Sequence, residues 1–197
     1  QQVTGFGGDP GRIFLAGESA GAAHVAAAAL LRNLHPAGGM PVAGVVLIVA
    51  PWNYPVLLLL SPLVGAVAAG NCAVLKPSGE VPHTSAVLSR IIAEVFDPGH
   101  VLVVEGSGAS VVPALMNGFR FDHVFFTGSA PVGRSILALA APQLVPATLE
   151  LGGKSPAIVD RRVDVKVAAG RIAWSKCFNA GQTCIATDHA LVHASVM

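Results

Sequence analysis

Short apolar runs alternate with longer helix-forming segments along most of this chain. The clearest run, Val45–Ala50 (VVLIVA), is continuous and β-branched, which is typical of a strand buried on both faces of a sheet. Similar short runs predict further strands at Ala73–Lys76, Val101–Glu105, His123–Thr127, Ala147–Glu150 and Ala157–Val159. This rhythm predicts an α/β fold, with a Rossmann-like, mostly parallel sheet and helices on both faces.

The segments between the strands have helical patterns. Helices are predicted over Val56–Ala69, His83–Phe96, Ala109–Asn117, Pro131–Ala141 and Val163–Trp174. Nearer the N-terminus, Arg12–Ala16 is predicted as a strand and Ala20–Leu31 as a helix. Pro and Gly cluster between His35 and Pro41, which predicts a boundary there.

Composition limits the classes of function. The net charge is +1, so there is no electrostatic reason to expect nucleic acid as a partner. No charged residue lies between Arg32 and Lys76, but prolines and glycines interrupt this stretch. Two buried elements therefore explain it better than the alternative, a membrane span. The 3 cysteines are too few for a disulfide framework and match no common zinc spacing, which favours a reducing compartment, the cytoplasm.

Three side chains are candidates for catalysis. Cys184, in GQTCIA, follows a polar, glycine-containing approach unlike a core strand, and an exposed thiolate there would be a strong nucleophile. Glu150 and Asn53 each follow or end an apolar strand, where ligands bind in open α/β sheets. The alternatives are an inert core cysteine, a solvated strand-end carboxylate and an ordinary turn asparagine.

Two further positions are candidates for phosphate or sugar binding. In FTGSAPVGR, Gly128 and Ser129 follow a strand and precede a helix, whose N-terminal N–H groups could bind a pyrophosphate. Lys76 ends another strand and could bind sugar hydroxyls or phosphate; the alternative is a solvated surface lysine.

Five motifs occur in a fixed order: APWNYP, GNCAVLKPS, DHVFFTGSAPVG, ATLELGGKSP and NAGQTCIA. Together they resemble the aldehyde dehydrogenase superfamily, and VVLIVAPWNYP and GQTCIATDHALVHAS resemble its class 3 branch. The resemblance extends from about Gly44 to Met197. It implies oxidation of an aldehyde substrate to a carboxylate with NAD or NADP.

The resemblance also implies roles for single residues. Cys184 matches the nucleophile, Asn53 the oxyanion-stabilising amide, and Glu150 the base that activates water. On the cofactor side, Lys76 matches the contact to the adenosine ribose. Gly128 and Ser129 match the turn beside the pyrophosphate, and Gly152 matches the neighbour of the nicotinamide. The implied domains are a cofactor-binding domain over 41–149 and the start of a catalytic domain over 150–197, after a first segment over 1–40.

The chain departs from the family pattern at two places. Where the family often has K-P-S-E, Gly79 follows Lys76-Pro77-Ser78, so the matched position lacks the carboxylate that binds the adenosine ribose. The preference between NAD and NADP is therefore open. The chain is also expected to be a fragment, without the later catalytic segment and without the strands through which the family forms oligomers.

The segment Phe6–Leu31 has a different resemblance. Gly17-Glu18-Ser19-Ala20-Gly21 fits the G-x-S-x-G pattern between a predicted strand and a predicted helix, which resembles the nucleophile elbow of carboxylesterase-type α/β-hydrolases. A serine without a partner base is not a catalyst, and nothing after Arg32 resembles the rest of that fold. The alternatives to the dehydrogenase are therefore a serine esterase that uses Ser19 and an inactive nucleotide-binding fragment.

Overall fold

The computed structural model describes residues 44–197, which fall into two compact units that meet after Glu150. The first unit ends at Glu150 and the second runs from Leu151 to Met197, and each is described by itself. The strand and helix predicted before residue 32, and Ser19 between them, lie outside the described residues.

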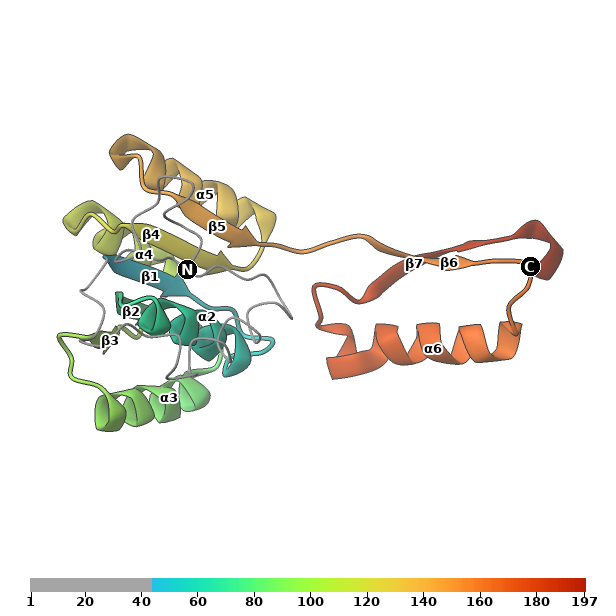
Figure 1. Ribbon diagram of the computed structural model, residues 1–197, viewed down its shortest axis with the longest axis horizontal. Helices are drawn as coiled ribbons and strands as arrows, with labels where there is room; N and C mark the ends of the chain where they lie inside the picture. Colours follow the sequence, from blue (N-terminus) through green and yellow to red (C-terminus); the bar gives the residue numbers. More distant parts are fainter. Residues whose placement is uncertain (1–43) are drawn as a thin grey trace, which may run out of the picture. The chain divides into compact units, whose positions relative to one another are not determined.

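The first unit is built on a parallel sheet of five strands (Figure 1). The strands follow each other along the chain as β1 (Val45–Val49), β2 (Cys72–Lys76), β3 (Val101–Val103), β4 (His123–Thr127) and β5 (Ala147–Glu150). Their order across the sheet is β3-β2-β1-β4-β5, and every neighbouring pair is parallel. The predicted parallel α/β sheet is confirmed.

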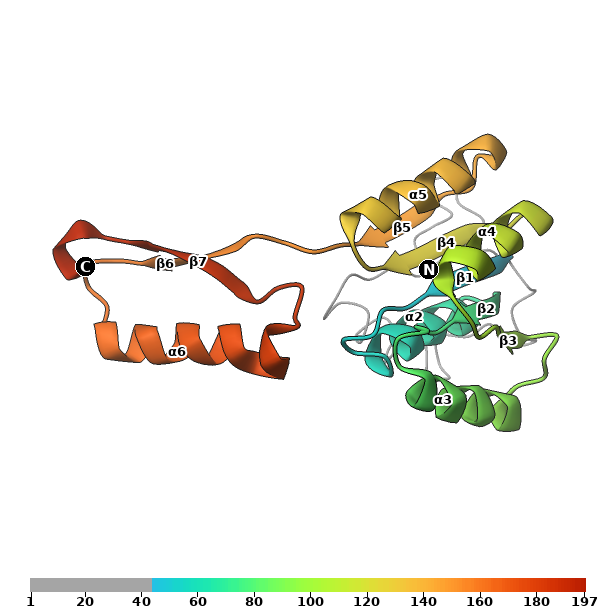
Figure 2. The same ribbon diagram turned by 180° about the vertical axis from the view of Figure 1, so that it is seen from behind.

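Helices cover both faces of this sheet (Figures 1 and 2). They are α2 (Leu57–Ala68), α3 (Pro82–Val95), α4 (Gly108–Gly118) and α5 (Ala130–Ala140), the last followed by the short 3₁₀ helix η3 (Ala141–Gln143). Helices α2 and α3 lie on one face, while α4 and α5 lie together on the other. This confirms the predicted placement of helices on both faces.

The end of α2 is set by Gly70. The backbone N–H of Gly70 donates to Val67 at 2.9 Å, and that of Asn71 donates to Ala66 at 2.9 Å. This pair of bonds is a Schellman motif, which needs a left-handed residue after the helix. Gly70 has a φ of 79°, so the glycine allows the chain to turn directly into β2.

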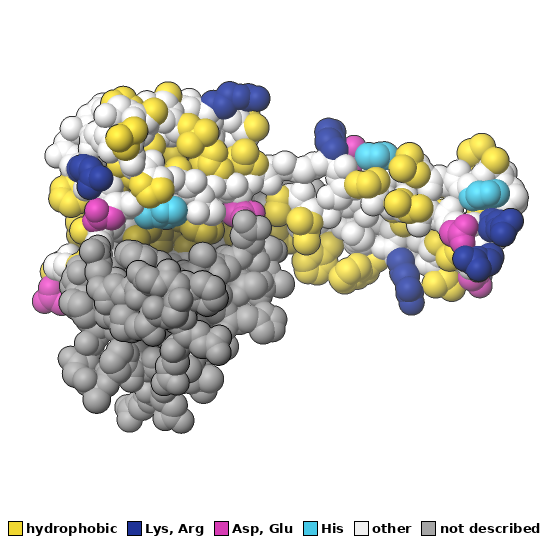
Figure 3. Space-filling model, turned by 45° about the horizontal axis from the view of Figure 1, so that its top comes forward, with side chains coloured by type: hydrophobic (Ala, Val, Ile, Leu, Met, Phe, Trp, Pro, Cys, Tyr) yellow, Lys and Arg dark blue, Asp and Glu magenta, His cyan; other side chains and the backbone are white. Residues whose placement is uncertain are grey.

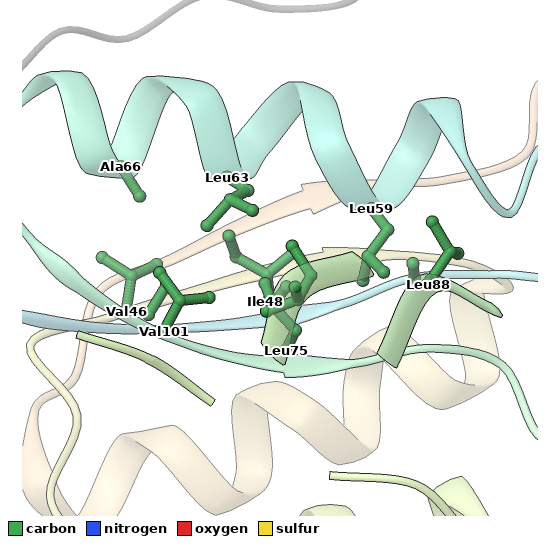
Figure 4. Close-up of a cluster of buried hydrophobic side chains, with 11 residues drawn as sticks. Val46, Ile48, Leu59, Leu63, Ala66, Leu75, Leu88 and Val101 are labelled. Atoms are coloured by element: carbon green, nitrogen blue, oxygen red, sulfur yellow. The ribbon is translucent and has the colours of Figure 1, made fainter. Parts of the chain in front are cut away.

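The core on the α2 face comes from alternate residues of the strands (Figure 4). Val46 and Ile48 of β1 and Leu75 of β2 point toward Leu59 and Leu63 of α2. Because β1 is also buried on its other face, at Leu47 and Val49, its whole length is apolar.

The second unit is a β-α-β arrangement. It contains β6 (Ser155–Val159), α6 (Val165–Cys177), the 3₁₀ segment η4 (Phe178–Gly181), β7 (Thr187–Val192) and the 3₁₀ helix η5 (Ala194–Val196). Strands β6 and β7 pair in parallel, with α6 packed against both. Only Val159 and Ala186 are buried hydrophobic residues in this unit. Strand β7 was not predicted, because TDHALV is half polar and lacks a continuous apolar run.

In residues 44–197, none of the helices has the length and apolar character that crossing a membrane requires. The apolar stretch after Arg32 contributes β1 and α2 instead, as far as it is described.

Candidate active site at the carboxyl edge of the sheet

The carboxyl ends of the five parallel strands lie at one edge of the sheet. The chain leaves β1 and β4 in opposite directions across the sheet, so the two strands form a topological switch point, where open α/β sheets bind ligands. The candidate residues of the first unit lie in or beside the segments that end there: Asn53, Lys76, Gly128, Ser129 and Glu150. The structure therefore brings to one edge residues that are up to 97 positions apart (150 − 53).

Backbone hydrogen bonds hold these ends in register. The N–H of Ala50, just after β1, donates to the carbonyl oxygen of Lys76 at 3.1 Å. On the other side of the switch point, the N–H of Gly128 donates to the carbonyl oxygen of Glu150 at 3.0 Å. Asn53 lies half-buried in the bend between β1 and α2.

Lys76 is not the solvated lysine that was the alternative for this position. Its side chain is 2% exposed, and its ammonium group donates to the carbonyl oxygen of Pro77. Burial lowers the pKa of Lys76, because desolvation penalises the charged amine, while the negative charge of Glu105 raises it. A lysine held in this way is a fixed hydrogen-bond donor at the strand end.

Gly128 and Ser129 connect β4 to α5. Ser129 is the N-cap residue of α5, and its side chain makes no capping hydrogen bond. A Cβ at Gly128 would lie 2.5 Å from Cζ of Phe126, which is buried. Packing against Phe126 therefore requires a glycine here, even without a ligand. The glycine also lets the start of α5 lie close to the sheet.

Lys76 and Glu150 point to opposite faces of the sheet. Lys76 pairs with Val49, which pairs with Phe126, which in turn pairs with Leu149. Paired residues in parallel strands share a face, and successive residues alternate. Glu150, one place after Leu149, therefore points to the α2 face, away from Lys76.

Cys184 lies in the second unit, on an exposed turn. The N–H of Ala186 donates to the carbonyl oxygen of Thr183 at 3.0 Å, which closes a turn around Cys184 and Ile185. A Cβ on Gly153 would lie 3.3 Å from the carbonyl oxygen of Cys184, so the second glycine of ATLELGGKSP packs against this turn. That contact had no signal in the sequence beyond the Gly-Gly pair itself. Gly152, by contrast, has open space where a side chain would be.

The backbone before Cys184 is strained. Asn179, Ala180 and Gly181 have φ values of 52°, 56° and 79°, three left-handed residues in succession. Only the glycine adopts this conformation without cost; a left-handed alanine costs about 1–2 kcal/mol. Such strain is concentrated at functional sites in proteins, which supports a special role for the turn that follows.

The three cysteines differ in exposure. Cys177 lies exposed at the last position of α6. Cys184 is exposed as well, whereas Cys72 is half-buried with its Sγ 3.6 Å from the carbonyl oxygen of Gly99. Exposure alone therefore does not separate Cys184 from Cys177.

Comparison with known proteins agrees with this architecture. Residues 37–197 match the model of the aldehyde dehydrogenase family. The chain is 51% identical over 153 residues to 4,4'-diaponeurosporen-aldehyde dehydrogenase of Staphylococcus aureus, covering 78% of this chain and 33% of that protein. It is 48% identical over 153 residues to the dimeric NADP-preferring aldehyde dehydrogenase of Rattus norvegicus, with the same coverage.

Solved structures give the same result. The substrate-bound state of Staphylococcus aureus AldH matches with a TM-score of 0.73 at 50% identity, over 77% of this chain and 33% of that one. Lactaldehyde dehydrogenase from Escherichia coli matches with a TM-score of 0.73 at 33% identity, over 79% and 33%. The chain spans about a third of the length of the curated relatives it matches. The family match over residues 37–197, with this level of identity, shows that the chain belongs to the aldehyde dehydrogenase family.

Proposed function

We propose that this protein oxidises aldehydes to carboxylates with NAD or NADP, through a covalent adduct on Cys184. The observation that supports this most is the switch point between β1 and β4, because Asn53, Lys76, Gly128 and Glu150 lie in or beside the strand ends at that edge of the sheet. In this proposal residues 41–149 form the cofactor-binding domain, and residues 150–197 begin the catalytic domain. The three unpaired cysteines agree with a cytoplasmic location.

The proposed chemistry begins with the Cys184 thiolate, which attacks the aldehyde carbon and forms a thiohemiacetal. The backbone N–H of Cys184 and the side-chain amide of Asn53 donate to the oxyanion that develops. NAD or NADP, when bound, would supply the acceptor for the hydride that this adduct loses as it becomes a thioester on Cys184. Glu150 then takes a proton from water as the water attacks the thioester, and the carboxylate leaves with release of the thiolate.

The described residues suit a dinucleotide. Lys76 is a fixed hydrogen-bond donor at the end of β2. Ser129 is the N-cap residue of α5, and its hydroxyl makes no hydrogen bond to the helix. The first turn of α5 adds the positive end of a helix dipole, although Pro131 removes one N–H donor. Gly152 has open space at its α-carbon, which would admit the nicotinamide closely. The rat relative is named as NADP-preferring, and the 35% identical structure of 3,6-anhydro-L-galactose dehydrogenase is a complex with NAP.

Aldehyde-dependent reduction of NAD(P)⁺ tests the function. The assay is run on the 197-residue chain and on a chimera in which residues 44–197 replace the matching third of the Staphylococcus aureus relative. We expect the chimera to oxidise aldehydes, Cys184→Ala to abolish the rate, and the matched variant Cys177→Ala to retain it. A folded chimera that binds cofactor but oxidises no aldehyde would contradict the proposal.

Acylation of the chain gives a second, independent measurement. We expect p-nitrophenyl acetate to acetylate Cys184 in preference to Cys177, which is also exposed, because only Cys184 follows the strained turn. Mass spectrometry of the labelled peptides locates the acetyl group. Ser19→Ala serves as a control, and loss of the acetyl group in that variant would support the esterase alternative.

A further inference from the structure

The loops that follow β2 and β3 touch at the carboxyl edge. Leu75 pairs with Val103, and the N–H of Val104 donates to the carbonyl oxygen of Leu75 at 2.8 Å, so the two chains leave the sheet side by side. Beyond the strands, a Cβ on Gly79 would lie 3.1 Å from the carbonyl oxygen of Gly106. The loop after β3 therefore lies directly against position 79, and a side chain there would require Gly106 to shift by a few tenths of an ångström.

A carboxylate stands beside this contact. Glu105 lies between Val104 and Gly106, is exposed, and pairs in no ion pair within residues 44–197. Its charge reaches the buried ammonium group of Lys76 and raises the pKa of that lysine, against the larger effect of burial. Lys76, at the end of β2, and Glu105, in the loop after β3, thus provide a hydrogen-bond donor and an acceptor at the same edge of the sheet.

Such a rim is suited to the ribose of an adenosine. A carboxylate accepts hydrogen bonds from the vicinal hydroxyls of a ribose, which is how many dinucleotide-binding folds select NAD. A phosphate on the 2′-hydroxyl brings about −1.5 to −2 charges, which the same carboxylate repels. A single acidic side chain at this place therefore favours NAD over NADP.

We propose that Glu105 binds the adenosine ribose and makes the site prefer NAD to NADP, from the loop after β3 instead of the loop after β2. This rests on the proposed function. Position 79 carries no carboxylate and lies against the Gly106 carbonyl oxygen, so the acidic group next to this contact comes from the loop after β3. Glu80 is the competing carboxylate on the β2 side.

Calorimetric titration of the 197-residue chain with NAD and with NADP tests this assignment. Glu105→Gln should raise the dissociation constant for NAD by about tenfold, the effect of one hydrogen bond to a charged group. The dissociation constant for NADP should stay the same or fall. Glu80→Gln is the matched control, an exposed acidic residue on the facing loop, and should leave the ratio of the two dissociation constants unchanged. Circular dichroism confirms that each variant is folded.

The remaining outcomes separate this inference from the function on which it rests. If the unmodified chain binds either dinucleotide but Glu105→Gln leaves the ratio unchanged, or Glu80→Gln shifts it, the role of Glu105 is wrong and the cofactor site stands. If the folded, unmodified chain binds neither NAD nor NADP, both the cofactor site and the role of Glu105 are wrong.

Discussion

At the scale of single residues, Gly128 has the sharpest steric requirement among the glycines of residues 44–150. A methyl group there would lie 2.5 Å from the Phe126 ring, which is buried. Gly128→Ala should therefore destabilise the first unit by about 1–3 kcal/mol, as overpacking does. Urea unfolding followed by circular dichroism measures this loss.

Gly65, within α2, is the matched control because nothing lies within 4 Å of the position where its Cβ would be. Gly65→Ala should stabilise the protein by about 0.5–1 kcal/mol, through helix propensity and a less flexible unfolded chain. Equal and small effects of the two substitutions would show that Phe126 can move, and the steric account of Gly128 would then be wrong.

Some of the candidate site could be predicted from the sequence and some could not. The positions of Asn53, Lys76 and Glu150 after apolar strands were visible, since parallel strands place their carboxyl ends together. The burial of Lys76 was not, because it depends on packing between strands distant in sequence. The facing position of Glu105 also follows from the pairing of β2 with β3, which no local pattern encodes.

At the scale of elements, the pair β4–β5 contains a histidine that responds to pH. His123 is partly buried, with Nε2 2.9 Å from the Thr148 hydroxyl, and burial lowers its pKa below the ordinary value of 6.5. Between the folded pKa and 6.5, the unfolded chain binds more protons than the folded one. Stability should therefore fall as the pH is lowered through this window.

Thermal unfolding at several pH values between 7 and 5 measures how stability changes with pH. His123→Gln should make this dependence weaker, while it keeps a polar contact to Thr148. His83→Gln, at an exposed position of α3, is the control and should leave the slope of the original chain. A slope that is unchanged in His123→Gln would assign the pH dependence to other groups.

The strands of the second unit carry apolar side chains on a face that α6 does not cover. Ile158 of β6 is 80% exposed, whereas its neighbour Val159 is 7% exposed. We expect Ile158→Asp to change the stability by no more than about 0.5 kcal/mol and to reduce aggregation, because it only replaces exposed apolar surface. Val159→Asp should unfold this unit. Light scattering and circular dichroism distinguish the two, and unfolding by Ile158→Asp would contradict the assignment of an uncovered face.

At the scale of the whole molecule, the two units differ in how much core they possess. The first has apolar clusters on both faces of its sheet, whereas the second buries only Val159 and Ala186 among its hydrophobic residues. Figure 3 shows hydrophobic side chains in yellow on the surface of the second unit. Trp174 and Ile185 of this unit are 69% and 68% exposed. A unit with so little buried area gains less from the hydrophobic effect to set against its conformational entropy, so it is expected to be the less stable of the two.

This difference predicts how the two units exchange amide hydrogens. In the 197-residue chain alone, amides of β1 and β4 should exchange slowly, while those of β6 and β7 should exchange at least a hundredfold faster, as in regions that open locally at about 3 kcal/mol less cost. In the chimera with the Staphylococcus aureus relative, the second unit should become protected. The turn that holds Cys184 should then become ordered as well. Hydride transfer should become faster in the chimera, since a displacement of the reacting groups by about 1 Å costs about a hundredfold in rate. Mass spectrometry of exchanged peptides measures all of these elements at once. If β6 and β7 exchange as slowly as β1 in the chain alone, the second unit is stable by itself and this prediction is wrong.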